Sequence, residues 1–95
     1  MIRREITIIN KLGLHARAAA KFVTLASTFD CAVQVARGER VVNGKSIMGV
    51  MMLAAAKGVS LELIVEGADE ERALSELQQL ILNRFGEPAQ VGIDI

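Results

Sequence analysis

Hydrophobic residues along the chain alternate between strand-like and helix-like spacing, and this alternation constrains the fold more than any other feature. Near the N-terminus, Ile2, Ile6 and Ile8 recur with a period of two among charged and polar residues, as in a strand with one buried face. Strand-like patterns return in three later segments, residues 31–36, 39–43 and 60–66. Four short strands are therefore predicted, the first over residues 2–9.

Apolar residues with helical spacing separate or follow these strands in three segments, residues 16–29, 47–55 and 70–85. Ser46 and Asp69 stand immediately before the second and third segments, where a helix N-cap is expected. Gly86 and Pro88 follow the third segment and favour the end of a helix. The predicted order of elements is β-α-β-β-α-β-α.

This order predicts an α+β fold. Short hairpin links and helices with one apolar face favour a two-layer sandwich, in which a four-stranded antiparallel sheet carries three helices on one face. A single domain is expected over residues 1–86. Residues 87–95 are predicted to form a C-terminal tail, because their alternating end has no evident partner strand.

Charge and aromatic content limit the function. The chain has 11 Lys and Arg residues, 11 Asp and Glu residues, three Phe, and no Trp or Tyr. A balanced charge argues against a generic surface for nucleic acid or anionic lipid, and few aromatic rings are present to stack on bases. An RNA-binding α+β domain is therefore a disfavoured alternative.

No metal, cofactor or membrane insertion is expected. One Cys and one His cannot form a zinc site alone, and we find no glycine-rich nucleotide loop. The longest apolar run, IMGVMMLAAA, is too short to span a bilayer. The N-terminal sequence MIRREITI lacks the apolar core of a signal peptide. These features predict a cytoplasmic protein.

His15, the only histidine, stands at the predicted start of the first helix, where Ser, Thr, Asp or Asn would be a better cap. The unpaired N–H groups and positive dipole end of a helix attract anions. Arg17 adds a fixed cation that can chelate phosphate oxygens. A neutral imidazole is a nucleophile, so His15 could accept a phosphoryl group. The alternative is a surface histidine without function beside a solvated arginine.

Two separate segments, GLHARAAAKFV and NGKSIMGVMMLAAAKG, together resemble the HPr family. This family comprises the histidine-containing phosphocarriers of the bacterial phosphoenolpyruvate phosphotransferase system. The resemblance covers about residues 2–86 and implies an open-faced β-sandwich. It also implies that His15 is phosphorylated on Nδ1, and that Arg17 and the backbone amides of Ala16 and Arg17 hold the phosphate. The implied donor is phosphorylated enzyme I, and the implied acceptors are EIIA-type proteins.

Ser46 has a sufficient structural explanation as a helix cap. The resemblance further implies that it is a regulatory serine, modified by HPr kinase/phosphorylase. A phosphate there would add about two negative charges at a helix N-terminus and oppose an acidic partner. An alternative function is a regulatory interaction protein that signals through Ser46 without phosphoryl transfer at His15.

The second predicted helix is apolar on nearly all sides, although only one side can face the sheet. We expect Ile47, Met48 and Met51 to form an exposed patch that matches the family's docking surface. Ala18 stands where many members have proline, which should affect stability slightly and leave the chemistry intact. A monomer is expected. The motifs favour the regulatory branch of the system over sugar transport, by resemblance alone.

Overall fold

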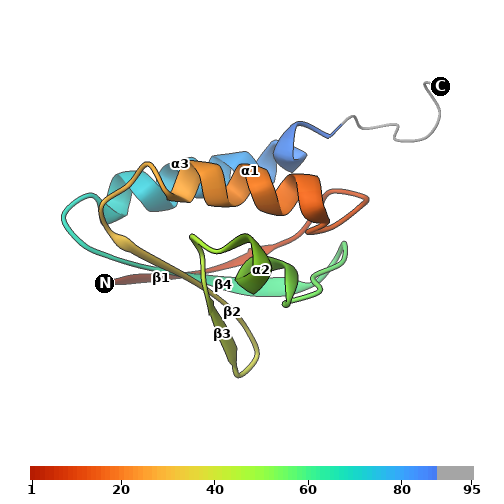
Figure 1. The fold of residues 1–95 in the computed structure, drawn as a ribbon, viewed down its shortest axis with the longest axis horizontal. Coiled ribbons are helices and arrows are strands. Elements are labelled where there is room, and N and C mark those ends of the chain that lie inside the picture. The colour runs from red at the N-terminus through yellow and green to blue at the C-terminus, as the bar shows by residue number, and fades with distance from the viewer. Residues whose placement is uncertain (88–95) are drawn as a thin grey trace.

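The computed structural model describes residues 1–87, and its architecture confirms the predicted α+β class. A four-stranded antiparallel sheet has the strand order β1-β4-β2-β3, and α1 and α3 lie side by side across one face (Figure 1). The elements are β1 (Ile2–Thr7), α1 (Ala16–Ala26), β2 (Ala32–Arg37), β3 (Arg40–Asn43), α2 (Ile47–Met51), β4 (Ser60–Glu66), α3 (Glu70–Leu82) and the short 3-10 helix η1 (Arg84–Gly86). The division between residues 1–86 and 87–95 stays a prediction.

The sheet shows why the strand sequences alternate. β4 lies between β1 and β2, so that Leu63 is paired with Arg4 on one side and with Val35 on the other. Leu61, Leu63 and Val65 are buried beneath the helices. Neighbouring residues point to the opposite face, where Arg3 and Glu62 form an ion pair of 2.8 Å. One face of the sheet is therefore covered by helices, and the other carries charged and polar side chains together with Ile64.

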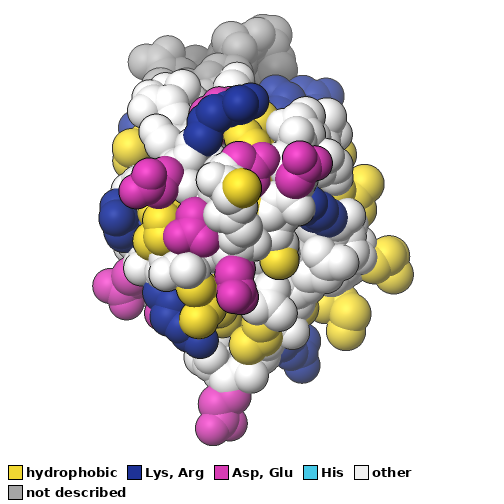
Figure 2. All heavy atoms as spheres, turned by 90° about the vertical axis from the view of Figure 1, so that its left-hand side faces the viewer, with side chains coloured by type: hydrophobic (Ala, Val, Ile, Leu, Met, Phe, Trp, Pro, Cys, Tyr) yellow, Lys and Arg dark blue, Asp and Glu magenta, His cyan; other side chains and the backbone are white. Residues whose placement is uncertain are grey.

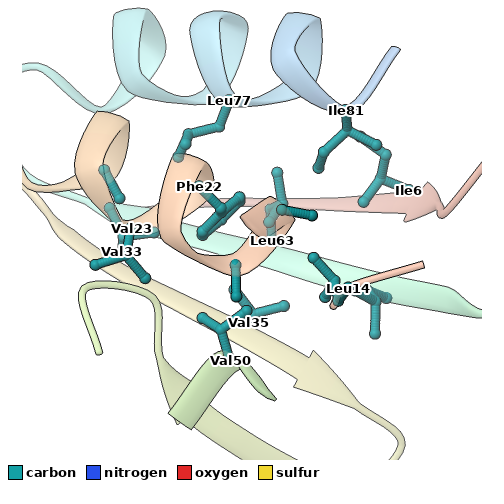
Figure 3. Packing of buried hydrophobic residues seen from close by; sticks show 14 of the residues in the cluster. Ile6, Leu14, Phe22, Val23, Val33, Val35, Val50, Leu63, Leu77 and Ile81 are labelled. Carbon is teal, nitrogen blue, oxygen red and sulfur yellow. The ribbon is translucent and has the colours of Figure 1, made fainter. Parts of the chain in front are cut away.

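The core lies between the helices and this covered face (Figure 3). Five apolar residues at helical spacing in the first predicted helical segment are buried, namely Ala19, Phe22, Val23, Ala26 and Phe29. Leu77 and Ile81 approach from α3, while Val50 is the buried residue of α2. The strands and the two long helices therefore share one core, and the connecting loops extend from it.

The second helix is shorter than predicted, because α2 ends before the expected Ala55. The guanidinium groups of Arg37 and Arg40 donate hydrogen bonds to the backbone carbonyl oxygens of residues 52–54, at distances of 2.9–3.0 Å. Ala54 then takes a left-handed conformation with φ of 49°. Side chains from the neighbouring hairpin thus satisfy the carbonyl groups that would otherwise continue the helix.

The other two helices also end earlier than predicted. α1 ends at Ala26 and not at Phe29, because the N–H groups of Thr28 and Phe29 bond to carbonyl oxygens three residues back and not four. Beyond α3, Arg84, Phe85 and Gly86 have φ values of 56°, 54° and 77°. Phe85 is buried, but it enters the core from this left-handed turn and not from α3.

Asp69 occupies the predicted N-cap position of α3 but makes no capping hydrogen bond. Its carboxylate instead accepts hydrogen bonds from the backbone N–H groups of Asp30 and Cys31, both at 2.9 Å. The N–H of Asp30 is the main reason why the pKa of Asp69 lies below its ordinary value. Asp69 therefore connects the α1–β2 loop with the start of α3. Figure 2 shows one end of the molecule, on which acidic side chains are numerous.

Candidate functional site

His15 is the N-cap residue of α1, as the sequence predicts. Its backbone is extended, with φ of −74° and ψ of 178°, and its carbonyl oxygen accepts the hydrogen bond of the Ala19 N–H at 2.8 Å. Its side chain makes no capping hydrogen bond. The first N–H groups of α1 have no partner within the helix, so the N-terminus of α1 keeps its capacity to bind an anion.

The loop that carries His15 is seated on the segment that follows α2. The Leu14 N–H donates to the carbonyl oxygen of Ala55 at 2.8 Å, and the Leu14 side chain is buried. Gly13 has φ of +67°, and a Cβ atom there would lie 2.5 Å from the oxygen of Ala55. Only glycine fits this position without strain or collision, and this close approach fixes where α1 begins.

A pocket of about 170 Å³ adjoins the start of α1. Its lining brings together the loop before α1, the first turns of that helix and the turn after α3, namely Leu12, His15, Arg17, Ala18, Lys21, Phe85, Gly86 and Glu87. Lys21 Nζ donates to the carbonyl oxygen of Phe85 at 2.8 Å. His15 and Arg17 therefore line the same pocket, and their roles stay predictions.

Glu87 joins this site from the far end of the chain. Its carboxylate accepts hydrogen bonds from Asn10 Nδ2 at 3.1 Å and from the Leu12 N–H at 3.3 Å. Its Oε2 atom lies 3.7 Å from Nε2 of His15. Burial acts to raise the pKa of Glu87, but the donated hydrogen bonds outweigh it, so the pKa lies below its ordinary value. Glu87 is therefore a carboxylate at neutral pH.

Asn10 and Glu87 were missed by the sequence analysis, which gave no role to the first and placed the second in the tail. Asn10 is fully buried, and its Nδ2 also donates to the carbonyl oxygen of Gly13 at 2.8 Å. A buried asparagine commonly has a specific hydrogen-bonding role, but burial of Asn10 is not evident from its place in the sequence. Residues 88–95 of the predicted tail lie outside the described residues.

Ser46 is the N-cap of α2, which confirms its predicted structural role. Its Oγ accepts a hydrogen bond from the Gly49 N–H at 3.1 Å. The side chain is half-buried. Its modification stays a prediction.

The apolar residues of α2 divide into buried and exposed groups, as predicted. Val50 is 1% exposed, whereas Ile47, Met48 and Met51 are 43%, 72% and 39% exposed. Met52, which the sequence analysis did not name, is 59% exposed and extends the patch. This surface is available to a partner, and its role in docking stays a prediction.

Two further findings concern residues 1–87 as a whole. Over this part of the chain, no helix combines the length and apolar character needed to cross a bilayer. The same residues contain no group of three or more His, Cys, Asp or Glu side chains arranged to hold a metal ion.

Comparison with known proteins assigns the family. The family model described as "PTS HPr component phosphorylation site" matches residues 2–83. The chain is 63% identical to the phosphocarrier protein HPr of Pseudomonas aeruginosa over 84 residues, which cover 87% of this chain and 93% of that protein. These matches define a phosphocarrier of the phosphotransferase system. The chain belongs to the HPr family.

Solved structures agree with this assignment. The crystal structure of HPr-C-His from Thermoanaerobacter tengcongensis matches with a TM-score of 0.89 and 46% identity, covering 93% of this chain and 99% of that one. A second crystal structure, of an HPr dimer from the same organism, matches with a TM-score of 0.74 and 47% identity. It covers 92% of this chain and 100% of that one. Membership of the family implies partners within the phosphotransferase system.

Proposed function

We propose that the protein accepts a phosphoryl group on Nδ1 of His15 from phosphorylated enzyme I and passes it to EIIA-type proteins. The observation that carries this proposal is the placement of His15. His15 caps α1 through its backbone alone, so its imidazole takes no part in capping and can react. The imidazole lines a pocket together with Arg17. Membership of the HPr family supports the same role.

The proposed transfer needs few groups. The lone pair of His15 Nδ1 attacks phosphorus, and the bond between phosphorus and the donor atom breaks with its electron pair returning to the donor. The N–H groups of Ala16 and Arg17 and the Arg17 guanidinium would hold the phosphoryl oxygens. An imidazole is both a nucleophile and a good leaving group, so positioning supplies most of the catalysis.

The test is to incubate the protein with enzyme I and phosphoenolpyruvate and to measure its intact mass. We expect one added phosphate that is lost in acid and that fragmentation places on His15. Ser46→Ala is a matched control and should gain the same phosphate. Absence of the phosphate, with an enzyme I that labels another HPr, would contradict the carrier role.

We propose the exposed residues of α2 as the surface that docks these partners. Ile47, Met48 and Met51 present flexible apolar side chains, which suit contact with several different proteins. Ser46 immediately precedes this patch in the chain. A charge added at Ser46 would therefore enter the proposed contact surface.

Phosphorylation of Ser46 by HPr kinase/phosphorylase is proposed to regulate this docking. We expect Ser46→Asp to weaken binding to enzyme I about tenfold, because one well-placed unfavourable charge costs about 1.4 kcal/mol. Ser46→Ala should bind normally but lose about 1 kcal/mol of stability with the cap. Titration calorimetry and urea unfolding measure the two effects. Equal affinity of the two variants for enzyme I would rule out regulation through charge at this position.

The other assignments made from the sequence are part of the same proposal. The protein is a monomer in the cytoplasm and serves the regulatory branch of the system. Residues 1–86 are its phosphocarrier domain. Light scattering on the purified protein measures its molar mass in solution, and we expect that of a monomer. The mass of a dimer, the state of the HPr structure described above, would contradict this assignment.

A further inference from the structure

We propose that Glu87 is a positioning residue that keeps a proton on Nε2 of His15, so that Nδ1 is the atom left to accept the phosphoryl group. This inference rests on the proposed carrier function and specifies how its acceptor atom is chosen. It assigns a role in the site to a residue near the end of the chain.

The position of Glu87 is built by the turn that follows α3. Phe85 is only 3% exposed and anchors the turn in the core. Lys21 Nζ holds the carbonyl oxygen of Phe85 at 2.8 Å. The consecutive left-handed residues of this turn bring the chain back to the start of α1, where Glu87 lines the same pocket as His15.

The carboxylate of Glu87 is held by hydrogen bonds from the loop that carries His15. Asn10 donates one Nδ2 hydrogen to Glu87 and the other to Gly13, so it connects Glu87 with the loop that carries His15. The Leu12 N–H supplies a second hydrogen bond. Because the Glu87 side chain is only 7% exposed, water competes little for its oxygens. Oε2 accepts one hydrogen bond, from Asn10, and has a second lone pair that can accept from the imidazole.

The Glu87 carboxylate lies close enough to His15 to become the hydrogen-bond acceptor of its Nε2–H group. The separation of 3.7 Å between Oε2 and Nε2 is longer than a direct hydrogen bond of about 2.7–3.2 Å. A small rotation of either side chain, or one bridging water, closes this gap. A neutral imidazole carries one N–H and one lone pair. A carboxylate beside Nε2 favours the form in which Nε2 carries the proton, which leaves the lone pair on Nδ1.

The same carboxylate suits the product of the transfer. When Nδ1 forms its bond to phosphorus, the donor leaves with its electron pair and the ring of His15 becomes positively charged while Nε2 keeps its proton. Glu87 would compensate this charge, and Arg17, which lines the same pocket, would hold the phosphoryl oxygens. In the next transfer the ring leaves as neutral imidazole with the same Nε2 proton, so no proton has to move.

The test compares Glu87→Ala and Glu87→Gln with the wild type, and uses Glu39→Ala, in the exposed β2–β3 turn, as a matched control. Nitrogen-15 NMR of the neutral imidazole reports which ring nitrogen carries the proton and needs no phosphoryl donor. We expect the Nε2–H form in the wild type and in Glu39→Ala, and a larger share of the Nδ1–H form in Glu87→Ala. The rate of phosphate acceptance should fall about tenfold in Glu87→Ala.

Glu87→Gln separates the two effects, because its amide oxygen can still accept from Nε2 but carries no charge. It should keep the wild-type proton position and show an intermediate rate. Wild-type proton position and rate in Glu87→Ala would overturn the inference. A wild-type protein that never accepts phosphate would instead overturn the carrier function, while the NMR comparison would still decide whether Glu87 sets the proton position.

Discussion

Replacing His15 with alanine is expected to abolish phosphate acceptance, a fall in rate of more than about 10³-fold, while the free energy of unfolding stays within about 0.5 kcal/mol of the wild type. The two effects separate because the imidazole makes no capping hydrogen bond and its backbone performs the cap. Alanine can adopt the same extended backbone conformation. The loss of the nucleophile therefore removes the proposed chemistry and leaves the start of α1 intact.

Intact mass after incubation with enzyme I and phosphoenolpyruvate measures the first effect, and urea unfolding measures the second. Two results would contradict the prediction in different ways. A His15→Ala variant that is labelled as fast as the wild type would place the acceptor at another residue. A variant with a large loss of stability would show that the imidazole supports the fold, and its missing label would then say nothing about chemistry.

Local patterns in the sequence were sufficient to predict most of the fold. The alternation of Leu61, Leu63 and Val65 identifies β4, because a strand covered on one face must place every second residue in the core. Ser46 was identified as a cap because its partner, the Gly49 N–H, lies only three residues away. A structural feature can be predicted from residue types when the contacts that cause it lie within one helical turn or one strand.

The sequence analysis missed contacts between residues that lie far apart in the sequence. Asp69 has the residue type and position of a cap, but its carboxylate accepts from the N–H groups of Asp30 and Cys31, which lie 39 and 38 positions earlier in the sequence. Likewise, Glu87 meets Asn10 across 77 positions of sequence. Neither pairing leaves a periodic or local signal. His15 was found from its place at a helix start, but its carboxylate neighbour required the folded chain.

The second large effect is expected from Gly13→Ala, which should lose about 3 kcal/mol of stability. About 1–2 kcal/mol would come from the left-handed backbone angle and the rest from overpacking, since the new Cβ would meet the oxygen of Ala55 at 2.5 Å. The collision involves backbone on both sides, so a change of rotamer cannot relieve it. The loop must move, and the Leu14–Ala55 hydrogen bond that fixes the start of α1 is weakened with it.

Gly38→Ala is the matched control for this prediction. Gly38 has a similar φ of +59°, but a Cβ atom there meets nothing within 4 Å, so it should lose only the cost of the backbone angle, about 1–2 kcal/mol. Urea unfolding compares the two variants, and the rate of phosphate acceptance is measured on the folded fraction of each. Because Gly13 positions His15 and Gly38 lies in the β2–β3 turn, only Gly13→Ala should be slow. Equal stability of the two variants would mean that the contact with Ala55 does not constrain the loop. Equal rates would mean that phosphate acceptance tolerates a displaced helix start.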